Sequence, residues 1–126
     1  MGIASNGFWN FYRGHGDASD QSLKSSPQDA STEDSLDMLR RVSAKTYHRL
    51  DLPDSGPRLG FIAQDVEAAC PSGWSNLVGK THYRWSGAPE GAEIRVLDYA
   101  RLTSVLWQCT RNLLARVEAL EARLAQ

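Results

Sequence analysis

The chain has few of the residues that build disulfide frameworks and metal sites. Its only two cysteines, Cys70 and Cys109, are far apart and lack the short spacing of paired zinc ligands. Its three histidines, His15, His48 and His82, are also scattered along the chain. We therefore expect two reduced, packed cysteines and neither a metal nor another cofactor.

The sequence also lacks an excess of charge of one sign and any long hydrophobic run. The 14 Lys and Arg residues nearly balance the 15 Asp and Glu residues. Without a basic field, we expect no nucleic-acid partner. No apolar run approaches the roughly 20 residues that cross a bilayer, and the N-terminus lacks the charged and apolar regions of a signal peptide. We expect a soluble protein, made in a cytoplasm, with no membrane partner.

The length of 126 residues limits the fold to one small domain with a modest core. The residue pattern predicts the α+β class, a small mixed globular domain of short strands and helices. Such a core does not stabilise both a globular body and a long solitary helix. We therefore expect the protein to oligomerise.

The first third of the chain predicts a strand, a linker and a helix. An aromatic run at 8–13 is typical of a strand, and the glycines of 14–16 predict a flexible turn after it. Residues 24–34 have the Ser, Pro, Gln and Asp content of a linker. Ser31 is a candidate N-cap for the helix that follows. The apolar residues that recur at helical spacing in this helix are Leu36, Leu39 and Val42.

The middle of the chain predicts short strands and a short helix. Residues 46–50 have strand character, and a turn at 53–57 separates them from a strand that begins at Arg58. Residues 60–69 change from an apolar run to helical spacing, which predicts a strand that leads into a helix. The core residues expected here are Phe61, Ile62 and Val66.

Residues 72–91 hold tryptophan and tyrosine residues between glycines, which predicts a β-hairpin or an extended arm. Exposed aromatic residues on an arm often contact another chain, although packing in the core is the commoner explanation of any one of them. Residues 93–97 alternate in polarity and predict a final strand.

The longest predicted element is a C-terminal helix over 98–125, about 40 Å long. Asp98 is a good N-cap, and neither Gly nor Pro occurs between it and Leu124. Apolar residues recur in a heptad pattern that is clearest in the last two heptads. The residues expected to form an oligomerisation seam are Leu106, Leu113, Val117, Leu120 and Leu124.

The heptad pattern leaves two arrangements of this helix open. Arg116 at position g and Glu121 at the following e position allow an ion pair between chains in a parallel coiled coil. A single amphipathic helix that folds onto its own domain fits the same residues about equally well. The heptads alone do not fix the number of strands.

Near the N-terminus, Ser19 and Lys24 form a candidate catalytic dyad. A serine hydroxyl is a poor nucleophile unless a base takes its proton, and a lysine is a base only where burial or a nearby cation depresses its pKa. Side chains five residues apart lie about 140° apart around an α-helix, so a dyad needs a turn or a lysine from a neighbouring chain. The same residue types are common in solvated loops, which is the alternative reading of this pair.

Four segments occur in order at 17–24, 58–67, 97–100 and 116–121. They contain the elements Ser-Asp-x-x-Leu-Lys, Gly-Phe-Ile-Ala-Gln-Asp-Val-Glu and Leu-Asp-Tyr. Over residues 17–126 the arrangement resembles the intramolecular chaperone domain of phage endosialidases and tail fibres, the S74 peptidase family. The resemblance implies a domain at the C-terminus of a trimeric fibre that drives trimeric folding and then cuts itself off.

The resemblance also implies roles for individual residues. The cut would fall between Ala18 and Ser19, with Ser19 as the nucleophile and Lys24 as the general base. Separately from the resemblance, Asp20 is a candidate to orient the lysine, although an aspartate ion-paired with the lysine would raise the lysine pKa. Residues 1–18 would then be the end of the client fibre and 19–126 the chaperone domain. The Ser-Ser-Pro sequence after the lysine departs from the family pattern.

The implied partners are two further copies of the chain, in a parallel homotrimer, and the upstream fibre or tailspike segment of the same polypeptide. The arm at 72–91 would grip that fibre. The implied location is the host bacterial cytoplasm during assembly of the phage virion, with release of the domain after cleavage.

Two other functions compete with self-release. In a non-catalytic trimerisation module, Ser19 and Lys24 would be ordinary linker residues and the C-terminal helix alone would be functional. A hydrolase that acts on other molecules is disfavoured, because the sequence has neither a Gly-rich nucleophile elbow nor a recognisable oxyanion-hole motif.

Overall fold

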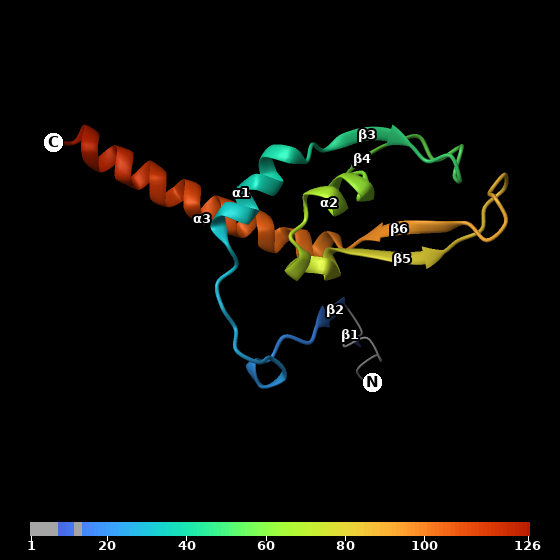
Figure 1. The fold of residues 1–126 in the computed structure, drawn as a ribbon, viewed down its shortest axis with the longest axis horizontal. Helices are drawn as coiled ribbons and strands as arrows, with labels where there is room; N and C mark the ends of the chain where they lie inside the picture. The colour runs from blue at the N-terminus through green and yellow to red at the C-terminus, as the bar shows by residue number, and fades with distance from the viewer. Residues whose placement is uncertain (1–7, 12–13) are drawn as a thin grey trace.

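The computed structural model describes residues 8–11 and 14–126, which form a mixed α+β fold (Figure 1). In chain order the elements are β1 (Phe8–Phe11), β2 (Gly14–Asp17), the 3-10 helix η1 (Gln21–Leu23), α1 (Thr32–Arg41), β3 (Lys45–His48), β4 (Pro57–Gly60), α2 (Ala63–Ala69), the 3-10 helix η2 (Ser72–Leu77), β5 (Val78–His82), β6 (Glu93–Leu97) and α3 (Tyr99–Leu124). The predicted α+β class is confirmed.

The N-terminal strands pair with each other. β1 and β2 are antiparallel, with Phe8 opposite Asp17 and Phe11 opposite Gly14. The predicted turn at 14–16 is therefore wrong, because these residues form a second strand. Residues 1–7 and 12–13 lie outside the described residues, so the predicted strand is confirmed only for 8–11, and the upstream segment 1–18 is described only in part.

α1 begins where the sequence predicts, because its first turn is capped locally. The Ser31 hydroxyl accepts a hydrogen bond from the Asp34 backbone N–H at 3.2 Å. The helix ends at Arg41, so Val42 is its C-cap and not part of it. Leu36 is buried as predicted, whereas Leu39 is 45% exposed, because the face of α1 that packs inward bears Ser35, Leu36 and Met38 instead.

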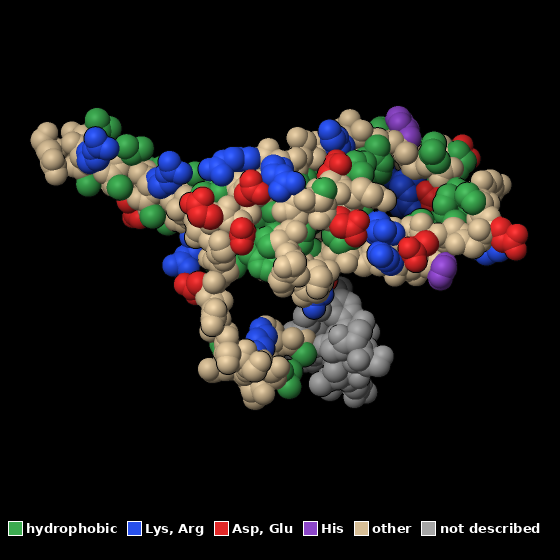
Figure 2. All heavy atoms as spheres, viewed as in Figure 1, with side chains coloured by type: hydrophobic (Ala, Val, Ile, Leu, Met, Phe, Trp, Pro, Cys, Tyr) green, Lys and Arg blue, Asp and Glu red, His purple; other side chains and the backbone are tan. Residues whose placement is uncertain are grey.

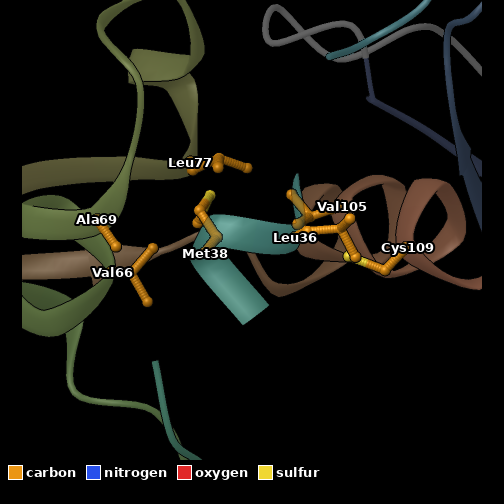
Figure 3. Close-up of a cluster of buried hydrophobic side chains, with 7 residues drawn as sticks. All are labelled: Leu36, Met38, Val66, Ala69, Leu77, Val105 and Cys109. Atoms are coloured by element: carbon orange, nitrogen blue, oxygen red, sulfur yellow. The ribbon is translucent and has the colours of Figure 1, made fainter. Parts of the chain in front are cut away.

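The core is small and lies where α1, α2, η2 and α3 meet (Figure 3). Its buried residues are Leu36, Met38, Val66, Ala69, Leu77, Val105 and Cys109. Phe61 packs against this cluster and Val66 is inside it, as predicted. Ile62 is 39% exposed, so the prediction for it is wrong; it is the N-cap of α2, where the chain turns at the surface. Both cysteines are free thiols.

Two antiparallel hairpins extend from the core on the side opposite to the C-terminal end of α3 (Figure 1). In the first, β3 pairs with β4 so that Lys45 lies opposite Gly60. In the second, β5 pairs with β6 so that Val78 lies opposite Leu97. The predicted arm at 72–91 and the predicted final strand are therefore one structure, because β6 is the second strand of the hairpin.

α3 is the long C-terminal helix that the sequence predicts. The Asp98 carboxylate caps it by accepting a hydrogen bond from the Arg101 backbone N–H at 3.0 Å. Its N-terminal half packs on the core through Leu102, Val105 and Cys109. Every residue from position 113 onward is exposed, and this half projects away from the body (Figure 1). Across residues 8–11 and 14–126, no helix combines the length and apolar character needed to cross a membrane.

Candidate functional site

The segment that carries Ser19 and Lys24 is held by a single 3-10 turn. Asp20 has extended backbone angles and is the N-cap of η1, where its Oδ1 accepts a hydrogen bond from the Ser22 backbone N–H at 2.8 Å. The turn is closed by two backbone bonds of 3.0 Å, from Leu23 N–H to the Asp20 carbonyl and from Lys24 N–H to the Gln21 carbonyl. The chain therefore reverses direction between the two candidate residues.

This turn brings the two side chains together within one chain. Lys24 Nζ donates a hydrogen bond to Ser19 Oγ at 2.5 Å. An α-helix would place these side chains about 140° apart, so the short 3-10 turn is what makes the contact geometrically possible. The contact has the reach that proton transfer between a base and a nucleophile requires. Whether the pair acts as a dyad stays a prediction.

Asp20 faces the turn, not the lysine. Among the described contacts, its carboxylate accepts from Ser22, and no ion pair joins it to Lys24 within residues 14–126. The backbone N–H and the hydroxyl of Ser22 hold the pKa of the Asp20 carboxyl below its ordinary value. The observed contact therefore gives Asp20 a structural task in the turn.

The dyad segment lies on an exposed linker, outside the core. All residues from 18 to 30 are exposed. After Lys24, Ser26 adopts a φ of +43°, an unusual conformation for a residue that precedes a proline. The linker is joined to α3 where the Gln108 side-chain amide donates to the Ala30 carbonyl at 3.0 Å. The surroundings of Ser19 and Lys24 in the single chain are therefore aqueous.

A second candidate site is the apolar stripe along α3, which begins at Leu106 and continues over the projecting half. Figure 2 shows hydrophobic side chains spaced along this part of the helix, with Arg side chains between them. The fractional exposures of the predicted seam residues are 50% for Leu106, 47% for Leu113, 51% for Val117, 54% for Leu120 and 86% for Leu124. These residues lie on one stripe and contact water in the single chain, so an interchain seam is available but is not itself part of the described structure.

A third feature, which the sequence did not reveal, is an open groove between the two hairpins. Its volume is about 560 Å³. The aromatic residues that line it are Tyr47, Phe61, Tyr83, Trp85 and Tyr99. The rings of Tyr83 and Trp85 stack with their centroids 5.6 Å apart. The groove is thus an aromatic surface formed by segments that are far apart in the sequence.

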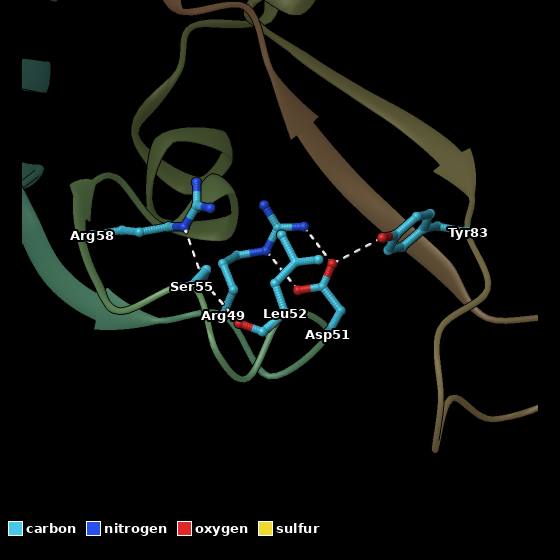
Figure 4. A network of polar contacts seen from close by, with 6 residues as sticks. All are labelled: Arg49, Asp51, Leu52, Ser55, Arg58 and Tyr83. Carbon is cyan, nitrogen blue, oxygen red and sulfur yellow. Dashed lines mark hydrogen bonds and ion pairs between the residues drawn. The ribbon is translucent and has the colours of Figure 1, made fainter.

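A polar network of residues that line the groove lies where the hairpin strands end (Figure 4). Arg49 Nε donates to Asp51 Oδ1 at 2.6 Å, and the Arg49 guanidinium also pairs with Asp51 Oδ2. Tyr83 Oη donates to the same Oδ2 at 2.9 Å, which joins the β3–β4 loop to the end of β5. The Arg49 guanidinium lowers the pKa of Asp51 to about 2, and the Asp51 carboxylate raises the pKa of Tyr83. No local sequence pattern predicts a contact between residues 32 positions apart.

Within residues 8–11 and 14–126, no three His, Cys, Asp or Glu side chains are grouped so that they could hold a metal ion.

Comparison with protein families gives a match. Residues 19–75 match the model of the Peptidase_S74 family, whose description is "chaperone of endosialidase". The matched segment starts at Ser19, includes Lys24, and runs through α1, β3, β4 and α2 into η2; β5, β6 and α3 lie outside it. No curated protein matches the chain.

Proposed function

Residues 19–75 belong to the Peptidase_S74 family, chaperone of endosialidase, and from this premise we propose a function for the whole chain. It is a C-terminal intramolecular chaperone that drives the trimerisation and folding of a phage tail fibre or tailspike. It then releases itself by autoproteolysis between Ala18 and Ser19. The observation that carries the proposal is the 2.5 Å contact between Lys24 Nζ and Ser19 Oγ, at the first residue of the family match.

The proposed cleavage uses atoms that are already close together. Ser19 Oγ attacks the carbonyl carbon of Ala18 while neutral Lys24 Nζ takes the hydroxyl proton. The bond between Ala18 C and Ser19 N then breaks, the amine of Ser19 takes a proton, and the Ala18 acyl group is left as an ester on Ser19 Oγ. Water opens this ester to an Ala18 carboxylate and a free Ser19 hydroxyl. Attack within the chain supplies a high effective concentration, which replaces an external catalyst.

Assembly supplies what the single chain lacks. A lysine ammonium becomes a base only in a site that excludes water, and both side chains of the pair are exposed in the single chain. In the proposal, neighbouring chains cover the linker once the trimer has formed. Cleavage therefore follows correct assembly, and a misassembled fibre keeps its chaperone.

The proposed trimer is held by the α3 stripe. Complete burial of an exposed leucine is worth about 1.5–3 kcal/mol, so each stripe leucine that is already about half buried in the single chain gains about half of this when the trimer forms. The positions of Arg116 and Glu121 favour parallel chains. In this arrangement three hairpin pairs point in one direction, toward the upstream fibre segment that is the proposed folding client. The proposed setting is the host bacterial cytoplasm during virion assembly.

The intact mass of freshly expressed protein tests the proposal. The wild-type chain is expected to give a fragment that starts at Ser19, and the Ser19→Ala variant is expected to stay at 14.0 kDa while it assembles normally. A wild-type chain that remains uncut but still forms trimers would instead favour a non-catalytic trimerisation module. The exposure of Ser19 and Lys24 in the single chain is the observation on the side of that alternative.

A further inference from the structure

We infer that Asp20 is a positioning residue for self-cleavage, which acts by capping the η1 turn and not through the charge of Lys24. The inference rests on the proposed function. It assigns the residue between the nucleophile and the turn a defined physical task. The lysine reaches Ser19 because the turn is formed, and the turn is formed because Asp20 caps it.

The geometry makes Asp20 the residue that starts the turn. Its side-chain Oδ1 accepts from the Ser22 N–H at 2.8 Å, and its carbonyl accepts from the Leu23 N–H at 3.0 Å. Ser19 directly precedes this cap, and Lys24 is the C-cap at the other end. The same residue therefore fixes both the direction of Ser19 and the path of the chain to Lys24.

Little else holds the turn in place. η1 has three residues, and a helix this short is not stable by its own backbone hydrogen bonds. None of its residues is buried, and the whole linker from 18 to 30 is exposed. With no packing to support it, the cap is a large part of what keeps Ser19 and Lys24 within reach of each other.

The role requires a hydrogen-bond acceptor and not a negative charge. The Asp20 carboxylate points at a backbone N–H, and no described contact joins it to the lysine. Asparagine is as good an N-cap as aspartate and has the same shape, whereas alanine has no acceptor. A carboxylate that tuned the lysine would behave differently, because its neutralisation would make the lysine a weaker base and shift the pH dependence of cleavage.

The test measures the cleavage rate of the full chain by intact mass from neutral to alkaline pH. Asp20→Asn is expected to cleave within about twofold of the wild type, with an unchanged pH profile, and Asp20→Ala about fivefold more slowly, as the usual contribution of an N-cap implies. Asp29→Ala is the matched control, because Asp29 is also an exposed acid of this linker. Size-exclusion chromatography with light scattering confirms that all variants assemble alike.

Three results would overturn the inference. If Asp20→Asn is as slow as Asp20→Ala, or if its pH profile moves, the carboxylate acts by charge. If Asp20→Ala cleaves at the wild-type rate, the residue does not position the pair. If the wild type itself is never cut, or if Ser19→Ala is cut at the same bond, the proposed function fails and the inference fails with it.

Discussion

The Tyr99 hydroxyl accepts a hydrogen bond from the backbone N–H of Phe61 at 3.1 Å, across 38 positions of sequence. The contact joins the first residue of α3 to the chain between β4 and α2, and the two rings lie 6.0 Å apart. Gly60 directly precedes this point, and a Cβ atom there would lie 2.6 Å from the Tyr99 hydroxyl. The Gly-Phe and Leu-Asp-Tyr elements of the sequence therefore depend on each other in space.

Gly60→Ala is expected to destabilise the body. The added methyl group would meet the hydroxyls of Tyr99 and Tyr47, at 2.6 and 2.9 Å, so at least one tyrosine must move. Overpacking of this kind costs about 1–3 kcal/mol, which should lower the Tm by several degrees. Thermal unfolding followed by circular dichroism, at one protein concentration, measures the change.

The control for this variant is Gly73→Ala, because a Cβ atom at Gly73 meets nothing within 4 Å. The double variant Gly60→Ala, Tyr99→Phe adds a stricter condition. Removal of the Tyr99 hydroxyl relieves the shorter of the two clashes, so the effects of the single changes should not add, with a coupling of about 1 kcal/mol. Additive effects would mean that Gly60 and Tyr99 do not interact as described.

The local parts of this fold could be predicted from sequence, and the paired parts could not. Ser31 and Asp98 each cap a helix by accepting from a backbone N–H three residues away, so the local sequence suffices to locate the starts of α1 and α3. The pairing of β5 with β6 depends on contacts across a ten-residue loop, and the sequence suggested two separate elements instead. Periodicity gave Ile62 a core position because it cannot show where a chain turns at the surface.

The candidate site also has features that the sequence predicted and features that it did not. Residue types together with the family resemblance picked out Ser19 and Lys24, but the turn that joins them depends on the Asp20 cap, for which the sequence had suggested a role toward the lysine. The contact of Asp51 with Tyr83 had no sequence signal at all. It depends on two hairpins that extend side by side, and this is a property of the whole fold (Figure 1).

Leu120→Asp is expected to prevent assembly while the body stays folded. Leu120 is 54% exposed on the projecting half of α3, where it makes no contribution to the core of its own chain. In a parallel seam, each copy would place a charge among leucines. This would weaken the free energy of association by about 2 kcal/mol or more per chain. Sedimentation velocity should show a monomer, and circular dichroism should show an otherwise folded chain.

Ala122→Asp is the matched control, because it adds the same charge two residues away, at an exposed position off the stripe. It should assemble like the wild type. If both variants assemble, the stripe is not the seam. If Leu120→Asp instead unfolds the body, the helix stabilises its own chain, and the solitary-helix arrangement is correct.

The Asp51 network predicts a loss of stability in acid. Arg49 and Tyr83 hold the Asp51 pKa at about 2, below its ordinary value of 3.8, so the folded state favours the ionised carboxylate. Because the Asp51 pKa is lower in the folded state, the ionised carboxylate stabilises the fold at pH values above its ordinary pKa. This stabilisation is lost as the pH falls from about 4 to about 2. The Tm of the wild type should therefore exceed that of Asp51→Asn at neutral pH, and the difference should shrink across this range.

The other carboxylates are the same in the wild type and in Asp51→Asn, so their effects on the Tm cancel when the two proteins are compared. Asp54→Asn is the control, because Asp54 is an exposed acid of the same loop that takes no part in this network. Tyr83→Phe should lower the Tm at neutral pH, because the Asp51 carboxylate loses one of its hydrogen-bond donors. For the same reason, the Tm of this variant should fall less than that of the wild type between neutral and acid pH. A constant difference between the wild type and Asp51→Asn at every pH would mean that the Asp51 pKa is not depressed in the folded protein.

Self-cleavage should depend on assembly even where Ser19 and Lys24 are intact. Both residues are exposed in the single chain, and a solvated lysine ammonium does not take the serine proton. Leu120→Asp should therefore stay uncut in the intact-mass assay, whereas Ala122→Asp should give the fragment that starts at Ser19. If the monomeric Leu120→Asp chain is cut as fast as the wild type, the turn is sufficient for catalysis and assembly does not complete the site. Dilution of the wild type before cleavage separates the same alternatives, because a rate that falls with concentration requires association and a constant rate does not.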